Sequence, residues 1–389
     1  MAKKKVGKFS SFLNNPIDFT LLITILLLLG IGLIMVLSAS SPSALAETGD
    51  SYRFFSRQLI FAVLGIIAMM AISKIDYRFY QKFYKHAWWI ALILLIAVKL
   101  IGKKVNGAQR WIYVTETLSF QPSEVVKFLV IIFYAGILVK NRDDLPYFGK
   151  GLVKHILMLA PLIGLLLIEP HFSASIVIIG IVCIMMISAG CKFTQFLAVG
   201  GGVGIPAAVL LIIKSPYRLQ RVVSFLDPWK DATDTGWQVI QSLYAIGSGG
   251  LFGVGLGESK QKYLYIPEPH NDFIFSIIGE ELGFIGCALI IVLFAIFIWR
   301  GVLIAMKAPD MFGSLVAIGI TALVGIQVII NIAVVTSSMP ATGMPLPFFS
   351  YRRNSIIYIT VPDGSFTEYI EGKCKVGKEG KGDALFFPI

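Results

Sequence analysis

Nine long apolar runs divide this sequence, and they restrict its fold more than any other feature. They lie at about 19–39, 58–73, 86–102, 121–139, 152–168, 172–189, 194–213, 273–299 and 313–335. A helix needs roughly 17–25 mainly apolar residues to cross the hydrocarbon core of a bilayer. Only 15% of the 389 residues are charged, whereas about a quarter are charged in an ordinary soluble domain. The sequence therefore predicts an all-α polytopic membrane protein with about nine transmembrane helices.

Basic residues between the runs predict the orientation. Residues 1–18 form a basic arm, and alternate loops after it are rich in lysine and arginine. These loops hold Lys74, Arg78, Lys82 and Lys85, then Lys140, Arg142, Lys150 and Lys154, then Lys192, and then Arg300 and Lys307. Loops that stay in the cytoplasm carry such an excess, so we expect a cytoplasmic amino terminus. The net charge of +11 fits this topology and an anionic lipid surface. We expect no nucleic-acid partner, because no basic domain lies outside the spans.

Two loops on the outer side break the charge rule. They carry Lys103, Lys104 and Arg110 in the short loop after the third run, and Lys214, Arg218, Arg221, Lys230, Lys260 and Lys262 in the large loop at about 214–272. Long loops cross the membrane regardless of charge, so a solvated surface also explains the second set. Cations held by the short loop suit an anionic ligand such as a phosphate or diphosphate.

Charged residues inside apolar runs are costly and usually face a cavity or a partner. Glu124 and Lys127 are three residues apart on one helix face, so they can pair. The pair either fastens two helices or lines a polar cavity that leads to Asp272. Asp272 precedes an apolar run, where it could be a helix N-cap or a catalytic group. Glu280 lies about 12 Å further along the helix and about 80° around it, so it could face the same cavity, with Glu281 pointing nearly the opposite way.

Two further segments have simple structural interpretations. The string Glu169-Pro170-His171 is expected to form a tight turn between two spans. The glycine-rich segment 247–257 resembles a phosphate loop only superficially, because no strand precedes it and no GK[ST] follows it. We expect a flexible outer loop there.

Five strings in the chain match the sequence pattern of a known protein family. They are NGAQRWI (106–112), FQPSEVVK (120–127), EPHFSASIVI (169–178), a long string at 217–286 that contains FLDPWKD and PEPHNDFIF, and NIAVVTSSMPATGMPLPFFSY (331–351). In these strings the chain resembles the shape, elongation, division and sporulation (SEDS) proteins. The FLDPWKD and PEPHNDFIF strings are closer to the FtsW and SpoVE branch than to the RodA branch. The resemblance implies a SEDS transmembrane domain at 19–351.

The resemblance also implies a function. SEDS proteins are peptidoglycan glycosyltransferases of the bacterial cytoplasmic membrane, which polymerise lipid II into β-1,4 glycan strands at its outer face. They work in septal division or spore wall synthesis with a class B penicillin-binding protein, a transpeptidase, and with other division or sporulation membrane proteins. Asp272 matches the catalytic aspartate of the family, and Glu124 and Lys127 match the glutamate and lysine of its fourth span. His270, in the same string as Asp272, is expected to line the substrate cavity.

The implied reaction assigns roles to the charged residues. The donor sugar is α-linked to a polyprenyl diphosphate and the product is β-linked, so one inverting displacement suffices. Asp272 would act as the base that deprotonates the acceptor 4-hydroxyl. The leaving diphosphate needs charge neutralisation, which Arg110, Lys103 or Lys104 and the outer-loop arginines could supply, with or without a divalent cation such as Mg²⁺ or Mn²⁺.

The resemblance ends abruptly after Tyr351. The family pattern continues there with a tenth span, whereas residues 352–389 are mostly polar, and their longest apolar stretch, at 356–359, is too short to cross a membrane. We interpret this tail as the result of a frameshift or truncation relative to the family. The bundle would then lack one wall.

Two other functions remain as alternatives. A lipid II flippase would also need charges that face a cavity and broken helices. An inactive scaffold would follow from the missing last span. A single acid at the outer boundary, rather than a relay of charges at the membrane midplane, favours the glycosyltransferase.

Overall fold

The structure, a computed structural model, describes residues 18–350 except 106–107, 114–118, 233–235, 264 and 267–268. The basic arm up to residue 17 and the polar tail from residue 351 lie outside these residues. The interpretation of the tail as a frameshift or truncation therefore stays a prediction.

Helices dominate the described part of the chain. The apolar ones are α1 (Phe19–Thr48), α2 (Arg53–Ile72), α3 (Arg78–Ile101), α4 (Pro122–Lys140), η3 with α5 (Phe148–Ile168), α6 (Phe172–Ser188), α7 with η4 and α8 (Phe193–Ile213), α11 (Ile274–Met306) and α12 (Met311–Val335). Within the described residues, eight of these are long and apolar enough to cross a membrane, and α6 is a shorter apolar helix. The predicted all-α polytopic fold is confirmed, with each expected run on one helix.

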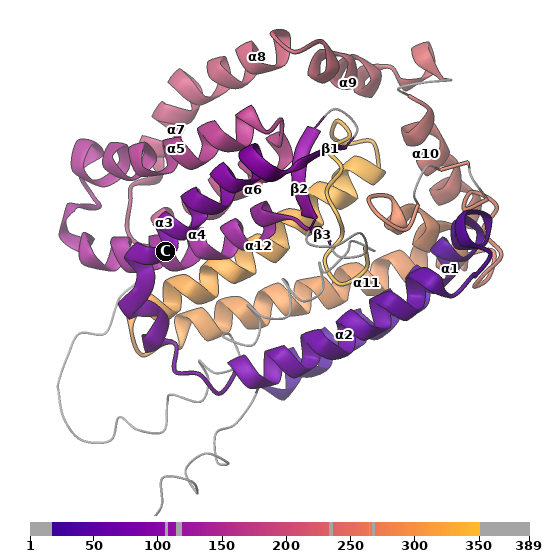
Figure 1. The fold of residues 1–389 in the computed structure, drawn as a ribbon, viewed down its shortest axis with the longest axis horizontal. Coiled ribbons are helices and arrows are strands. Elements are labelled where there is room, and N and C mark those ends of the chain that lie inside the picture. Colours follow the sequence, from indigo (N-terminus) through magenta and orange to yellow (C-terminus); the bar gives the residue numbers. More distant parts are fainter. Residues whose placement is uncertain are drawn as a thin grey trace, which may run out of the picture.

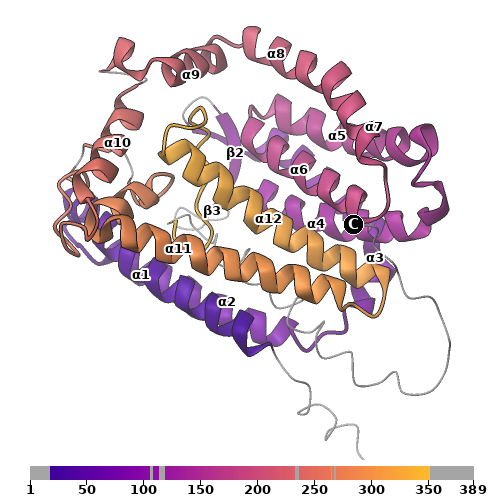
Figure 2. The same ribbon diagram turned by 180° about the vertical axis from the view of Figure 1, so that it is seen from behind.

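α12 lies at the centre of the bundle. It packs against α11, α6 and α4, while α1 packs against α11 and α2 packs against α1 (Figure 1). From behind, α8 and α9 (Pro216–Leu226) arch away from this core (Figure 2), and α10 (Trp237–Gly249) returns to pack against α11. The segment Phe193–Ile213 buries none of its apolar residues within the protein, as expected for a helix whose surface faces lipid.

One segment departs from the all-helical prediction. The short loop after α3 forms a small antiparallel sheet of β1 (Lys103–Val105), β2 (Ala108–Tyr113) and β3 (Ser119–Phe120), in the order β1-β2-β3. Pairing of its backbone groups within the sheet satisfies donors and acceptors that would be costly to leave unbonded at a membrane boundary.

The large loop between α8 and α11 is also ordered. It contains α9 (Pro216–Leu226), η5 (Pro228–Asp231) and α10 (Trp237–Gly249). The glycine-rich segment 247–257 ends α10 and is a loop from Gly250 onward, held against α11 by backbone hydrogen bonds. The Val254 and Gly255 N–H groups donate to the carbonyl groups of Glu280 and Glu281 at 2.9 and 3.1 Å, and Phe284 donates to Gly250 at 2.9 Å.

The close contact between the segment 250–255 and α11 requires glycine on both sides. Gly283 interrupts the helical geometry of α11 with a φ of 66°, and Gly253, with a φ of 81°, sits against it. A Cβ on Gly253 would lie 2.1 Å from the Glu281 carbonyl oxygen, so the two backbones can approach this closely only without side chains.

Candidate active site

Asp272 lies immediately before α11, at what we call the Asp272 end of the bundle. Phe273, not Asp272, occupies the N-cap position of α11. The alternative that Asp272 is a helix N-cap is therefore wrong. The Asn331 side-chain amide of α12 donates to the Asp272 carbonyl at 2.9 Å and to the Met344 carbonyl at 2.7 Å. These bonds hold the backbone of Asp272 against the segment that follows α12.

The Asp272 carboxylate borders Gly343 in that segment. A Cβ added to Gly343, whose φ is 67°, would lie 3.2 Å from Asp272 Oδ2. The segment itself is held from α6, because Ser173 donates its hydroxyl to the Thr342 carbonyl at 2.6 Å. Asp272 thus lies beside a backbone strip at 341–344 that connects it to the start of α6.

Three arginines converge on these two segments. Arg221 of α9 donates to the Ala341 carbonyl at 2.6 Å. Arg218, one turn earlier, lies over the Phe172 ring at the start of α6, with its guanidinium carbon 5.3 Å from the ring centroid. Arg110 of β2 donates to the Pro170 carbonyl in the turn before α6. The structure therefore brings three of the predicted cations, from two separate loops, to the start of α6 and to the segment 341–344 that borders Asp272.

The start of α4 contacts the turn before α6. Gln121 and His171 approach to 3.4 Å between their side-chain nitrogens, which joins the amino end of α4 to that of α6. One turn into α4, Lys127 and Glu124 form an ion pair at 2.7 Å, with Lys127 almost fully buried. Because both residues belong to α4, the pair does not fasten two helices.

The turn Glu169-Pro170-His171 is confirmed as a tight connection, since the His171 N–H bonds to the Leu166 carbonyl at 2.8 Å.

This turn also buries a carboxylate that the sequence analysis did not select. Glu169 is 2% exposed, and this burial raises its pKa to about 7, although Lys99 and Arg110 act in the opposite direction. The sequence feature that could have identified Glu169 is its position directly before a proline turn between two spans.

His270, predicted to line the cavity, stacks on the Phe54 ring of α2 with a centroid distance of 5.0 Å. Its burial lowers the pKa to about 4, so the ring is neutral at pH 7.

Two of the predicted cations, both lysines, are not placed at Asp272. Lys103 lies over the Tyr113 ring at 5.3 Å, and the Lys104 side chain is outside the described part of the chain.

The interpretation of Glu280 is wrong. Its carboxylate accepts hydrogen bonds from the Ser259 hydroxyl and, at 2.9 Å, from the Lys260 N–H. Glu281 is equally buried and pairs with Lys262. Helix periodicity could not reveal this, because the loop at 257–262 folds back over both carboxylates.

Comparisons with known proteins agree with this architecture. The family model of cell cycle proteins of the FtsW, RodA and SpoVE type matches residues 19–364. Stage V sporulation protein E of Bacillus subtilis is 43% identical over 89% of this chain and 95% of its own length. A probable peptidoglycan glycosyltransferase FtsW of Trichlorobacter lovleyi is 42% identical over 87% of this chain and 89% of its own.

Solved structures share the fold. A chain from a peptidoglycan synthase complex that coordinates polymerisation and crosslinking aligns with a TM-score of 0.76 at 25% identity, covering 92% of this chain and 99% of that one. The Rod shape determining protein RodA of Thermus thermophilus aligns with a TM-score of 0.69 at 24% identity, covering 92% and 98%. The chain therefore belongs to the FtsW, RodA and SpoVE family of membrane proteins.

Proposed function

We propose that this protein is a peptidoglycan glycosyltransferase that polymerises lipid II into β-1,4 glycan strands. The observation that carries the proposal is the convergence of Arg110, Arg218 and Arg221 on the start of α6 and on the segment 341–344, of which the second borders Asp272. A carboxylate with cations on the adjoining segments suits a reaction in which one hydroxyl loses a proton and one diphosphate leaves. The FtsW relative carries the same activity in its name.

Asp272 acts as the general base. It takes the proton of the acceptor 4-hydroxyl while that oxygen forms a bond to the anomeric carbon of the donor sugar. The bond between the anomeric carbon and the diphosphate oxygen breaks with its electron pair, and the configuration inverts. The product is a β-linked sugar, a protonated Asp272 and a polyprenyl diphosphate.

The arginines stabilise the departing diphosphate. An arginine has five N–H donors in a planar fork and can bind a carbonyl oxygen and a phosphate together. Donors held in advance by backbone carbonyls need little reorganisation when negative charge develops on the leaving group. The buried Glu124–Lys127 pair lies further along α4, where we assign it to the wall of the substrate cavity.

A divalent cation is a further candidate for charge neutralisation. Among the described residues, no three His, Cys, Asp or Glu side chains come together as a metal site. Mg²⁺ that neutralises a diphosphate is bound by one or two carboxylates together with the phosphate oxygens, so we keep the cation as a proposed helper of the arginines.

The site is expected at the outer face of the bacterial cytoplasmic membrane, with the amino terminus in the cytoplasm. Support comes from the loop charges, which place the sheet and the large loop outside. A class B penicillin-binding protein is the expected partner, together with other division or sporulation membrane proteins. The solved synthase complex, which couples polymerisation with crosslinking, supports such a partner.

Polymerisation of labelled lipid II by the purified protein, alone and with its transpeptidase, tests the proposal. Loss of a general base typically costs about 10²–10⁴ in rate, so Asp272→Asn should make almost no glycan while it folds as the wild type does. Glu258→Gln is the matched control, because Glu258 is an exposed carboxylate on the same loop. Normal glycan synthesis by Asp272→Asn would refute the assignment of the base. Movement of lipid II across vesicles without polymer from the wild type would favour the flippase.

A further inference from the structure

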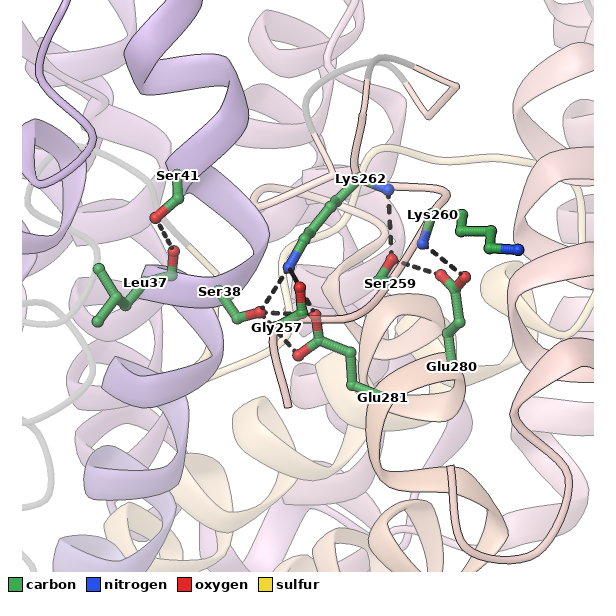
Figure 3. A network of polar contacts seen from close by, with 9 residues as sticks. All are labelled: Leu37, Ser38, Ser41, Gly257, Ser259, Lys260, Lys262, Glu280 and Glu281. Carbon is green, nitrogen blue, oxygen red and sulfur yellow. Dashed lines mark hydrogen bonds and ion pairs between the residues drawn. The ribbon is translucent and has the colours of Figure 1, made fainter. Parts of the chain in front are cut away.

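Two neighbouring carboxylates of α11 hold the loop at 257–262 from below (Figure 3). Glu280 binds Ser259 and the Lys260 N–H, and Glu281 binds the Lys262 ammonium at 3.0 Å. Both carboxylates are almost completely buried. Neither is used in the proposed reaction, and a buried charge is costly unless it is fully bonded.

Lys262 is bonded through all three of its N–H donors. They reach the Gly257 carbonyl at 2.5 Å, the Ser38 hydroxyl oxygen at 3.2 Å and Glu281 Oε1 at 3.0 Å. The Ser38 hydroxyl lies 2.6 and 2.7 Å from the two Glu281 oxygens. Since Ser38 belongs to α1 and Glu281 to α11, this cluster of Ser38, Lys262 and Glu281 attaches the loop to two helices at one point (Figure 3).

The same loop continues to Asp272 through further attachments. The Trp237 indole donates to the Tyr265 carbonyl at 2.7 Å, and His270 stacks on Phe54 of α2. The loop is therefore docked on the hairpin of α1 and α2 twice, near its start through Ser38 and near its end through Phe54. Asp272 follows two residues later, where Asn331 binds its carbonyl.

We infer that Lys262 and Glu281, joined by Ser38, are positioning residues that fix the loop carrying Asp272 and thereby set the place of its carboxylate. This inference rests on the proposed function only for its kinetic consequence. A general base must be held within about 0.5 Å of its productive position, and a displacement of about 1 Å can cost roughly 100-fold in rate.

The test uses a double variant, Lys262→Met with Glu281→Gln. Removal of one partner would leave a lone buried charge and could unfold the protein, whereas removal of both charges with retained volume is often tolerated. The matched control is Asp18→Asn with Arg300→Gln, which removes an ion pair from the opposite end of the same helix α11.

Hydrogen–deuterium exchange of the full-length protein in detergent is measured first. The double variant should exchange faster in peptides that span 257–273, with α11 itself unchanged, while the control should leave these peptides as in the wild type. Unchanged exchange at 257–273 in the double variant overturns the inference, whatever the activity.

Lipid II polymerisation is then measured for the same proteins. The double variant should lose about 10- to 100-fold in kcat with KM within about twofold, because the substrate-binding cations are untouched. Faster exchange with an unchanged kcat would also overturn the positioning role. If the wild type makes no glycan, the proposed function fails, whereas the exchange measurement still decides whether the cluster fixes the loop.

Discussion

Replacing Gly249 by alanine should destabilise this protein, although alanine is the better helix former. Gly249 is the last residue of α10, and a Cβ there would lie 1.9 Å from the carbonyl oxygen of Gly279 in α11. Both atoms belong to backbones that cannot rotate away, so the two helices would have to separate by about 1.5 Å to restore a normal contact.

The cost follows from the contacts at this crossing. Overpacking of this kind costs about 1–3 kcal/mol. Separation would also weaken the backbone bonds from Val254 to Glu280 and from Phe284 to Gly250, each with a net value of about 0.5–1.5 kcal/mol. Alanine offsets about 1 kcal/mol through its helix propensity. We expect a net loss of about 1–5 kcal/mol.

Gly247, two residues earlier on α10, is the matched control. A Cβ there would meet nothing within 4 Å, so Gly247→Ala should stabilise the protein by about 0.5–1 kcal/mol. Thermal unfolding in detergent, followed by tryptophan fluorescence, should show a Tm that falls by about 5 °C or more for Gly249→Ala and rises slightly for Gly247→Ala. A Gly249→Ala protein that melts at or above the wild-type temperature would refute the reasoning.

Two further predictions concern the buried titratable groups Glu169 and His270. Because the pKa of Glu169 is raised from 4.5 to about 7, the folded state holds its proton more tightly than the unfolded state. Stability should fall from pH 4.5 to pH 7 by about 3 kcal/mol, and Glu169→Gln should abolish that fall in melts recorded across this range. The pKa of His270 is lowered from 6.5 to about 4, so stability should instead fall as the pH drops from 6.5 towards 4, again by about 3 kcal/mol. His270→Phe, which keeps the stack on Phe54, should remove this acid sensitivity, and an unchanged acid slope would contradict the assignment.

Several features of the fold and site followed from local sequence patterns. The lengths of the apolar runs predicted the membrane helices, because the thickness of a bilayer and the rise of a helix fix that length. The pair Glu124 and Lys127 followed from helix spacing alone, and it forms within α4. The position of Asp272 before α11 and the clustering of cations in the two outer loops were also visible in the sequence.

Tertiary structure decided how these parts meet. Ser38 and Glu281 are 243 residues apart in the sequence, and no periodicity relates them. The expectation that Glu280 could face the same cavity as Asp272 was derived from an isolated helix, but the loop at 257–262 covers its carboxylate. The sequence by itself determined which segments lie in the membrane, since that depends on local hydrophobicity. Only the folded chain determined which buried charges hold the loop before Asp272. The partner of each buried charge depends on how helices that are distant in the sequence pack together.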